Sequence, residues 1–160
     1  MPALRIRRLI RSVTVVKRSS LAAVLATGAI LATAAQAQLP PVQTANGVQY
    51  VTGGFGQDES NALKQARSDY TLALTFAVAA SGSASSPYAG NVQVRLSEAD
   101  GKVVLDTLST GPYFLADVKP GAYQLVVTYE GKSQSKDVTI VAGKTTDLKF
   151  TWSRPASGPD

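Results

Sequence analysis

Apolar and polar residues alternate along much of the chain. In the clearest stretch, Tyr123, Leu125 and Val127 alternate with Gln124 and Thr128. Successive side chains of a β-strand point to opposite faces of the sheet, so a period of two predicts a strand with one buried face. The same alternation predicts further strands at 70–77, 92–97, 103–108, 113–117, 138–140 and 147–152, after a first short strand at 48–51.

Turn signals lie between these segments. Asp100-Gly101 is typical of a tight hairpin turn, and Pro120-Gly121 precedes the strand that contains Tyr123. About seven short strands, spaced by roughly 8 to 12 residues and each with one apolar face, predict a single antiparallel β-sandwich of the transthyretin-like or immunoglobulin-like type. A closed barrel would require similar patterning.

A different spacing near residue 60 predicts one short helix. Ala62, Leu63 and Ala66 recur at helical intervals, and Asp58 is a suitable N-cap. We expect about three helical turns that end near Ser68. A single helix near the start of the domain disfavours a doubly wound α/β fold, because helices and strands alternate in that class.

Residues 1–37 have the features of a secretory signal peptide. The segment is basic at its start, continues with an apolar run of about 15 residues from Leu21 to Ala35, and ends with Ala35-Gln36-Ala37, whose small residues suit signal peptidase. We expect cleavage after Ala37, because the apolar run is shorter than the roughly 20 residues of a membrane-spanning helix. A retained anchor is the alternative. This leader is typical of Gram-negative bacteria, so we expect a periplasmic protein, or else a fully secreted one, with no membrane span in the mature form.

The net charge of +5 belongs to this leader. Six of the 16 Lys and Arg residues and none of the 11 acidic residues lie in residues 1–37, so residues 38–160 contain 10 basic and 11 acidic residues. Nucleic-acid binding depends on basic surfaces, so a nearly neutral exported domain is not expected to bind nucleic acid.

The remaining chain is expected to form one domain with two flanking segments. Residues 38–47 form an extended lead-in, since Pro40-Pro41 prevents a helix. The β-sandwich domain follows at 48–152. Residues 153–160 are rich in Pro, Gly and Ser, a composition that favours disorder.

The residue types of the chain disfavour catalysis. It contains no His and no Cys, which supply most transition-metal ligands, general bases and thiol nucleophiles, so we expect neither an enzyme nor a cofactor. Ser133 and Lys136 have the spacing of penicillin-recognising enzymes, but residues three apart in a strand face opposite sides. Glu98, Asp100 and Asp106 flank a hairpin turn without the spaced oxygens of a calcium loop, so no metal site is expected.

The glycine-rich stretch from Gly53 to Gly56 invites the question of a nucleotide site. A dinucleotide-binding turn needs a third glycine where this chain has Glu59. A phosphate at this helix start would also face Asp58 and Glu59, whose charges instead complement the helix dipole. We therefore interpret the stretch as a turn from strand to helix.

Loops remain the best candidates for ligand binding, because binding residues are often on loops. Tyr88 and Tyr113 lie near expected loops and should be less constrained than Tyr123, Phe150 and Trp152, which fall on apolar strand faces and should pack in the core. The first candidates for contacting a glycan or peptide are Gly54, Phe55, Gly56 and Tyr88.

The segment from Asn91 to Trp152 resembles the carboxypeptidase regulatory-like family. The most specific element is Pro120-Gly121-Ala122-Tyr123 before a regular strand. The other elements are Val92-Gln-Val-Arg-Leu96, Asp100-Gly-Lys102, Leu115-Ala-Asp-Val-Lys119, Gln124-Leu-Val-Val-Thr-Tyr-Glu-Gly131 and Val138-Thr-Ile140.

This resemblance implies a small transthyretin-like sandwich. Members of the family are mostly non-catalytic and act as folding, spacing or binding modules, so no active-site residue carries over. The chain departs from the family before Asn91, where the glycine-rich loop, the helix and the strand after Tyr70 replace the usual first strand. The strand topology of that first third is left open.

The export signal, the residue types and the resemblance together favour a non-enzymatic exported module. We expect it to contact another, unidentified protein of the cell envelope as an interaction or structural accessory protein. The alternative is a module that binds carbohydrate or peptidoglycan through aromatic residues on loops.

Overall fold

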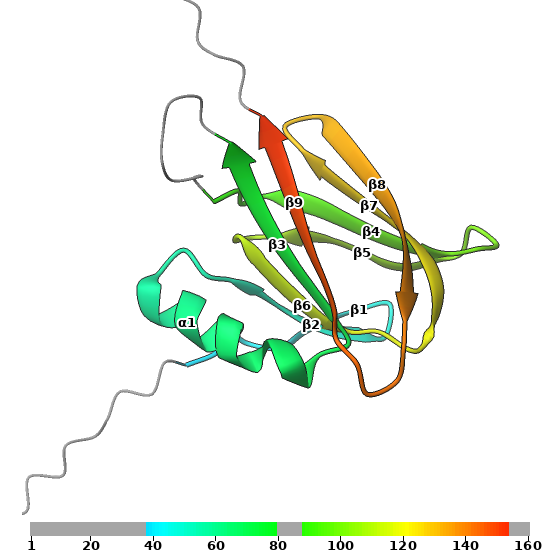
Figure 1. The fold of residues 1–160 in the computed structure, drawn as a ribbon, viewed down its shortest axis with the longest axis horizontal. Coiled ribbons are helices and arrows are strands. Elements are labelled where there is room, and N and C mark those ends of the chain that lie inside the picture. Colours follow the sequence, from blue (N-terminus) through cyan, green and yellow to red (C-terminus); the bar gives the residue numbers. More distant parts are fainter. Residues whose placement is uncertain (1–37, 80–87, 154–160) are drawn as a thin grey trace, which may run out of the picture. The chain divides into compact units, whose positions relative to one another are not determined.

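The computed structural model describes residues 38–79 and 88–153 (Figure 1). The expected signal peptide at 1–37 and the tail after Ser153 lie outside the described residues, as do residues 80–87. The described part contains nine strands, one α-helix and one 3₁₀ turn.

The strands form two sheets. We call the first sheet A; its order is β1-β2-β6-β3-β9. Its strands are β1 (Gln43–Ala45), β2 (Val48–Gly53), β6 (Tyr113–Asp117), β3 (Leu72–Ala79) and β9 (Thr146–Ser153). We call the second sheet B; its order is β5-β4-β7-β8. Its strands are β5 (Val103–Ser109), β4 (Val92–Glu98), β7 (Gly121–Tyr129) and β8 (Lys132–Ile140).

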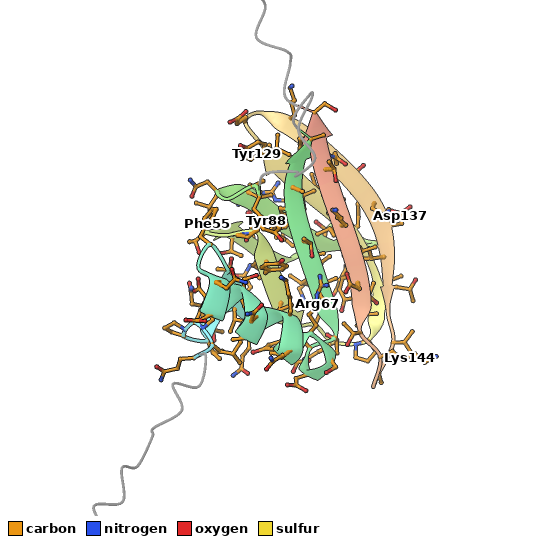
Figure 2. The ribbon with its side chains drawn as sticks, turned by 60° about the vertical axis from the view of Figure 1, so that its left-hand side comes forward. Phe55, Arg67, Tyr88, Tyr129, Asp137 and Lys144 are labelled. Carbon is orange, nitrogen blue, oxygen red and sulfur yellow. The ribbon has the colours of Figure 1, made fainter. Side chains whose placement is uncertain are left out.

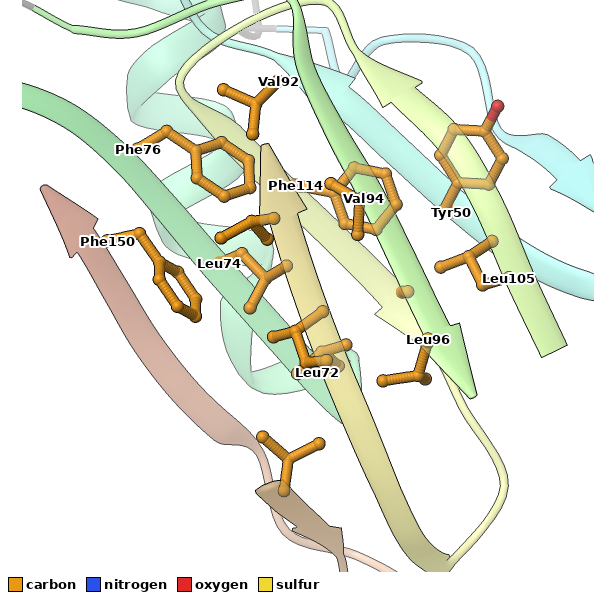
Figure 3. Close-up of a cluster of buried hydrophobic side chains, with 14 of the residues drawn as sticks. Tyr50, Leu72, Leu74, Phe76, Val92, Val94, Leu96, Leu105, Phe114 and Phe150 are labelled. Carbon is orange, nitrogen blue, oxygen red and sulfur yellow. The ribbon is translucent and has the colours of Figure 1, made fainter. Parts of the chain in front are cut away.

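The two sheets pack face to face around one apolar core, which confirms the predicted β-sandwich. Leu74 and Phe76 of β3 contribute to the core from sheet A, and Val94 and Leu96 of β4 contribute from sheet B, all of them fully buried (Figure 3). Burial of one such side chain stabilises a fold by about 1.5–3 kcal/mol. The predicted inner face of β7 is likewise buried at Tyr123, Leu125 and Val127, as are Phe150 and Trp152 of β9.

Pairing is antiparallel between all neighbouring described strands except β3 and β9, which are parallel. Leu74 is opposite Leu148, Phe76 is opposite Phe150, and Val78 is opposite Trp152. The chain passes through all of sheet B before it returns beside β3. This pairing brings residues near 75 and residues near 149 to the same surface of the molecule.

A third layer covers part of the outer face of sheet A. The helix α1 (Gln57–Ala66) continues into the 3₁₀ turn η1 (Arg67–Asp69). It packs Leu63 and Ala66 against Val51, Ala73 and Leu115 in a second buried cluster. β3 is therefore buried on both faces, and its small residue Ala73 lets the helix approach the sheet.

Several local predictions need correction. Asp58 is not the N-cap: α1 begins at Gln57 after the N-cap Gly56, so Asp58 lies in the first turn, where its charge still complements the helix dipole. The third strand begins at Leu72 instead of Tyr70. β8 begins at Lys132, well before the expected Val138.

A strand also occurs within the expected lead-in. β1 pairs with β2 through a turn in which Asn46 has φ 49° and Gly47 has φ 84°. Two consecutive residues with positive φ are typical of the type I′ turn that joins tight hairpins. The sandwich therefore begins at Gln43, before the predicted start at residue 48.

Candidate functional site

The glycines of the stretch before α1 serve close packing. Gly53 and Gly54 have φ of 155° and 99°, and a Cβ on Gly54 would lie 2.4 Å from the Tyr113 ring. The Gly54 amide donates a hydrogen bond to Glu59 Oε2 at 2.9 Å. Glu59 therefore turns back from the first helical turn toward the loop, in the manner of a capping residue. This geometry supports the interpretation of a turn from strand to helix.

Phe55 and Gly56 complete the turn and are exposed. The carbonyl of Gly56 accepts the first helical hydrogen bond, from the Ser60 amide at 2.8 Å. The Phe55 side chain is 66% exposed, yet its ring lies over Gly90, where an added Cβ would be 2.5 Å from the ring. Phe55 is thus held in place on one side and open to solvent on the other.

Tyr88 lies close to this turn. It is 48% exposed and forms a β-bridge with Ala77 at the end of the loop. Its ring centroid is 5.7 Å from that of Tyr113, and the Tyr113 hydroxyl donates to the Tyr88 hydroxyl at 3.2 Å. Figure 2 shows Phe55 and Tyr88 near one end of α1.

The structure thus links Gly54 and Tyr88 through Tyr113, and it places Phe55 over Gly90, two residues after Tyr88. Gly56 makes no such contact and belongs to the start of α1. We call the exposed pair Phe55 and Tyr88 the aromatic rim. Gly54 is buried beneath it and offers no surface to a ligand. Tyr113 is 3% exposed, so the expectation that it would be less constrained is wrong. It is buried because it packs beneath α1.

A groove extends from Tyr88 along the outer face of sheet A, with a volume of about 560 Å³. Thr75 and Ala77 of β3 form its floor. Lys64 of α1 and Arg67 of η1 line one side, and Asp147 and Lys149 of β9 line the other. Tyr113 of β6 also contributes to the lining. We call it the α1–β9 groove.

The cations of the groove have defined positions around Tyr113. Lys64 Nζ lies 5.7 Å and Arg67 Cζ 5.9 Å from the centre of the Tyr113 ring, within the range of cation–π attraction. Arg67 Nη1 also forms an ion pair with Asp147 Oδ2 at 3.2 Å, and Arg67 Nη2 donates to Thr75 Oγ1. Arg67 therefore links η1 to both β3 and β9.

The pKa values of Tyr113 and Tyr88 are shifted in opposite directions. Burial opposes ionisation of Tyr113, but hydrogen bonds with the Tyr88 and Ser60 hydroxyls and the nearby Lys64 ammonium together lower the Tyr113 pKa. The pKa of Tyr88 is raised, first by the hydrogen bond with Tyr113, then by the negative charge of ionised Tyr113, and last by burial. The two hydroxyls therefore titrate as a linked pair, and the hydrogen bond between them is the first cause that lowers the pKa of Tyr113 and raises that of Tyr88.

The motifs rejected from the sequence have ordinary structural contacts. Ser133 lies on the exposed strand β8, with its hydroxyl 2.8 Å from that of Thr128 on β7. Asp106 forms an ion pair with Arg95 at 2.7 Å, and Asp100 accepts a hydrogen bond from the Lys102 amide within the hairpin turn. Among residues 38–79 and 88–153, no three His, Cys, Asp or Glu residues are grouped so that they could hold a metal ion.

Comparison with known proteins gives no assignment, since no protein-family model and no curated protein matches the sequence. Within the described ranges, none of the helices combines the length and apolar character needed to cross a membrane.

Sequence reasoning found the aromatic rim but missed the α1–β9 groove. Lys64 and Arg67 have an ordinary helical spacing, and Lys149 alternates with buried residues as any surface strand residue does. The groove exists because the parallel β3–β9 pairing places Lys149 beside Thr75, its register partner. A local sequence pattern cannot predict the pairing of two segments that are about seventy residues apart.

Proposed function

We propose that this chain is a non-enzymatic binding protein that acts outside the cytoplasm and contacts another protein of the cell envelope through the aromatic rim. One observation carries the proposal. All 11 aromatic residues lie in the described part of the chain, and Phe55 and Tyr88 are the two whose side chains are exposed. Exposed aromatic residues with a fixed position are typical of the residues that dominate protein interfaces.

The way in which the rim is held supports this proposal. The Phe55 ring lies over Gly90, and the hydrogen bond between the Tyr88 and Tyr113 hydroxyls ties Tyr88 to a buried residue. Side chains that are ordered before binding lose less conformational entropy when a partner docks. The absence of His and Cys from the sequence favours a binding role over catalysis.

A pull-down from the periplasm with chemical crosslinking tests the proposal. We expect the full chain to capture a partner protein, and we expect the double variant Phe55→Ser/Tyr88→Ser to lose most of that capture. Leu108→Ser is the matched control, because Leu108 is 45% exposed on β5, which belongs to sheet B. A chain that remains a lone monomer at every concentration would contradict the proposal.

Carbohydrate or peptidoglycan binding is the second candidate. The observation that favours it is the same exposed Tyr88 ring, because an aromatic face can stack on the apolar face of a sugar ring. Sedimentation with purified sacculi separates the two candidates. A glycan-binding protein would pellet with sacculi that have been stripped of protein, whereas a protein-binding module would stay in the supernatant.

We further propose that the chain is exported and processed after Ala37, because of the basic and apolar leader. Cell fractionation should place the product in the periplasm, and its intact mass should correspond to a chain that begins at Gln38. A full-length product that remains with the membrane would support the retained anchor instead.

Membership of the carboxypeptidase regulatory-like family is also a proposal. The Pro120-Gly121 turn leads into β7, and the Tyr123 hydroxyl donates to the carbonyl of Lys119 at 2.9 Å. Such a bond from a tyrosine to the backbone just upstream is a recurrent feature of β-sandwiches. An experimental structure in which β4–β9 follow the strand order of that family would support membership, and a different order would contradict it.

A further inference from the structure

We propose that the α1–β9 groove binds carboxylate side chains of an acidic segment in the partner protein. This inference rests on the proposed function, because it assigns the chemistry of the partner segment that docks beside the aromatic rim. It concerns a surface that the sequence did not indicate.

The first argument is the local excess of positive charge. Three cations, Lys64, Arg67 and Lys149, line the groove together with one carboxylate, Asp147. That carboxylate is already paired with Arg67 at 3.2 Å. The described residues as a whole contain nine Lys or Arg and ten Asp or Glu, so this concentration of cations is a property of the groove and not of the domain.

The second argument is that two of these cations are available. Among the described residues, neither the Lys64 nor the Lys149 ammonium forms an ion pair with a carboxylate. Both residues are exposed on opposite sides of the groove. An arriving carboxylate could contact either ammonium without breaking an ion pair among the described residues, although the Lys64 ammonium already lies 5.7 Å from the centre of the Tyr113 ring. It would also gain from a positive potential that is partly shielded from solvent by the groove walls.

The third argument is that the groove also offers a hydroxyl donor. While both hydroxyls are protonated, Tyr113 donates to Tyr88 at 3.2 Å, and the Tyr88 hydrogen has no acceptor among the described residues, so it can donate to a ligand oxygen. Hydrogen bonds to an ionised acceptor are shorter and stronger than those between neutral groups.

The groove fits a peptide carboxylate better than a neutral sugar. Recognition of sugar hydroxyls uses side chains that both donate and accept hydrogen bonds, whereas the charged residues here are mainly donors and the one acid is occupied by Arg67. Of the two tyrosines in the lining, Tyr113 is 3% exposed and offers little ring surface on which a sugar could stack, which leaves Tyr88 alone. At the Tyr88 end, the exposed Phe55 ring lies over Gly90, two residues after Tyr88, and an apolar side chain of the same partner segment can pack there.

A direct binding assay tests this inference. A fluorescent poly-glutamate peptide is titrated with the purified full chain, and anisotropy is recorded at low and at physiological salt. We expect binding that weakens with added salt. We expect the double variant Lys64→Gln/Lys149→Gln to weaken it by about tenfold or more, as for loss of directly contacting charges.

The control variant removes the same charge elsewhere. Lys132→Gln/Lys136→Gln alters two exposed lysines of the edge strand β8, and we expect less than about a twofold change, as for charges remote from a contact. Because all four lysines are exposed, both double variants should keep the thermal midpoint of the parent chain. The same titration with oligogalacturonate, a carboxylated glycan, tests the other source of carboxylates.

Three results would overturn the inference: no binding of poly-glutamate, an equal loss in the control, or tighter binding of oligogalacturonate than of the peptide. The pull-down separates this failure from failure of the proposed function. If partner capture is lost in Phe55→Ser/Tyr88→Ser but unchanged in Lys64→Gln/Lys149→Gln, the proposed function stands and the groove inference fails. If poly-glutamate binds at the groove but no envelope protein is captured, the proposed function fails and the carboxylate site stands.

Discussion

The two sheets bury their inner faces in the same way but differ in their outer faces. The outer face of sheet A is covered in part by α1, and the cover leaves a groove beside it. Among the described residues no helix covers the outer face of sheet B, which carries polar side chains together with the apolar Val126 and Leu108 and an exposed ion pair between Arg95 and Asp106. This face is hollowed as well, by a pocket of about 710 Å³ on the uncovered strands. A helix that covers only part of a sheet leaves a boundary between covered and open strands. In this molecule aromatic and cationic side chains meet at that boundary.

The largest expected difference between the two regions is at their positive-φ glycines. Gly54→Ala places a Cβ 2.4 Å from the Tyr113 ring at φ 99° beneath the cover of sheet A, whereas Gly101→Ala has φ 87° and nothing within 4 Å in the hairpin of sheet B. Left-handed backbone costs a non-glycine residue about 1–2 kcal/mol, and overpacking adds about 1–3 kcal/mol. We expect Gly54→Ala to lower the free energy of unfolding by about 3 kcal/mol or more.

Gly101→Ala should lower it by about 1 kcal/mol, since it suffers the backbone strain alone. Urea denaturation of both variants measures the difference. Equal losses would show that the contact of Gly54 with Tyr113 is not tightly packed, and would weaken the contrast between the covered and the bare face.

The second comparison concerns the arginines on the two outer faces. Arg67→Met removes an ion pair with Asp147, a hydrogen bond to Thr75 and the guanidinium over the Tyr113 ring. Arg67 Nε is buried and has no acceptor among the described residues, which destabilises the parent chain. Methionine removes this cost, so part of the loss is offset. We expect a net loss of about 1 kcal/mol in the free energy of unfolding.

Arg95→Met is the matched change on sheet B. Its ion pair with Asp106 is exposed, and exposed pairs contribute about 0–1 kcal/mol. We therefore expect a loss of less than about 0.5 kcal/mol, with most of it removed by high salt. Thermal denaturation at low and high salt checks both variants, and a larger loss for Arg95→Met than for Arg67→Met would reverse the comparison.

The smallest expected effects are shifts in tyrosine ionisation. Lys64→Met should raise the pKa of Tyr113, because the ammonium is one of the groups that lower this pKa against the effect of burial. Glu98→Gln should lower the pKa of Tyr123, which burial and the Glu98 charge both raise. Titration of isotope-labelled tyrosines by NMR assigns each ring, and shifts in the opposite directions would contradict the electrostatic description of both sites.

The same shifts set the pH dependence of stability. The pKa of Tyr113 is lower in the folded than in the unfolded chain, so its contribution is present above the unfolded pKa and is lost as pH falls through the folded value. The pKa values of Tyr70, Tyr88 and Tyr123 are raised, so their contributions are present below the unfolded pKa and are lost as pH rises through the folded values. Tyr70 and Tyr123 stand apart from the hydrogen-bonded Tyr88–Tyr113 pair, and we expect their contributions to be lost as pH rises past about 10.

The strands of the core could be predicted because each has one face that must exclude water. Tyr123, Leu125 and Val127 alternate with polar residues for that reason, and the structure confirms their burial. β3 carries a weaker signal, since Ala73 and Ala77 occupy its second face. These residues are small because a helix or the groove lies above them, and alternation alone does not distinguish that situation from an exposed face.

Predictions failed where distant segments decide the environment. Tyr113 follows Gly111-Pro112 and was expected to be less constrained, but α1 and the side chains of Lys64 and Arg67 cover it. The β1–β2 hairpin is a different failure, because the Asn-Gly signal of its turn was present in the sequence. Pro40-Pro41 disfavours a helix, but it does not prevent a strand that begins at Gln43.

The side of the sandwich where β8 and β9 meet is joined by side chains instead of a strand ladder. Trp152 Nε1 donates to the carbonyl of Lys132 at 3.0 Å, Gln134 Nε2 donates to the carbonyl of Thr151 at 3.0 Å, and Thr146 Oγ1 donates to the carbonyl of Thr139 at 3.2 Å. Exposed sheet edges invite strands from other molecules, and such growth leads to aggregates. β8 and β9 are the last strands of their sheets, and three of their main-chain carbonyls are already engaged by these side chains. An incoming strand therefore finds fewer free acceptors along these two edges. This favours a protein that stays dispersed at high concentration.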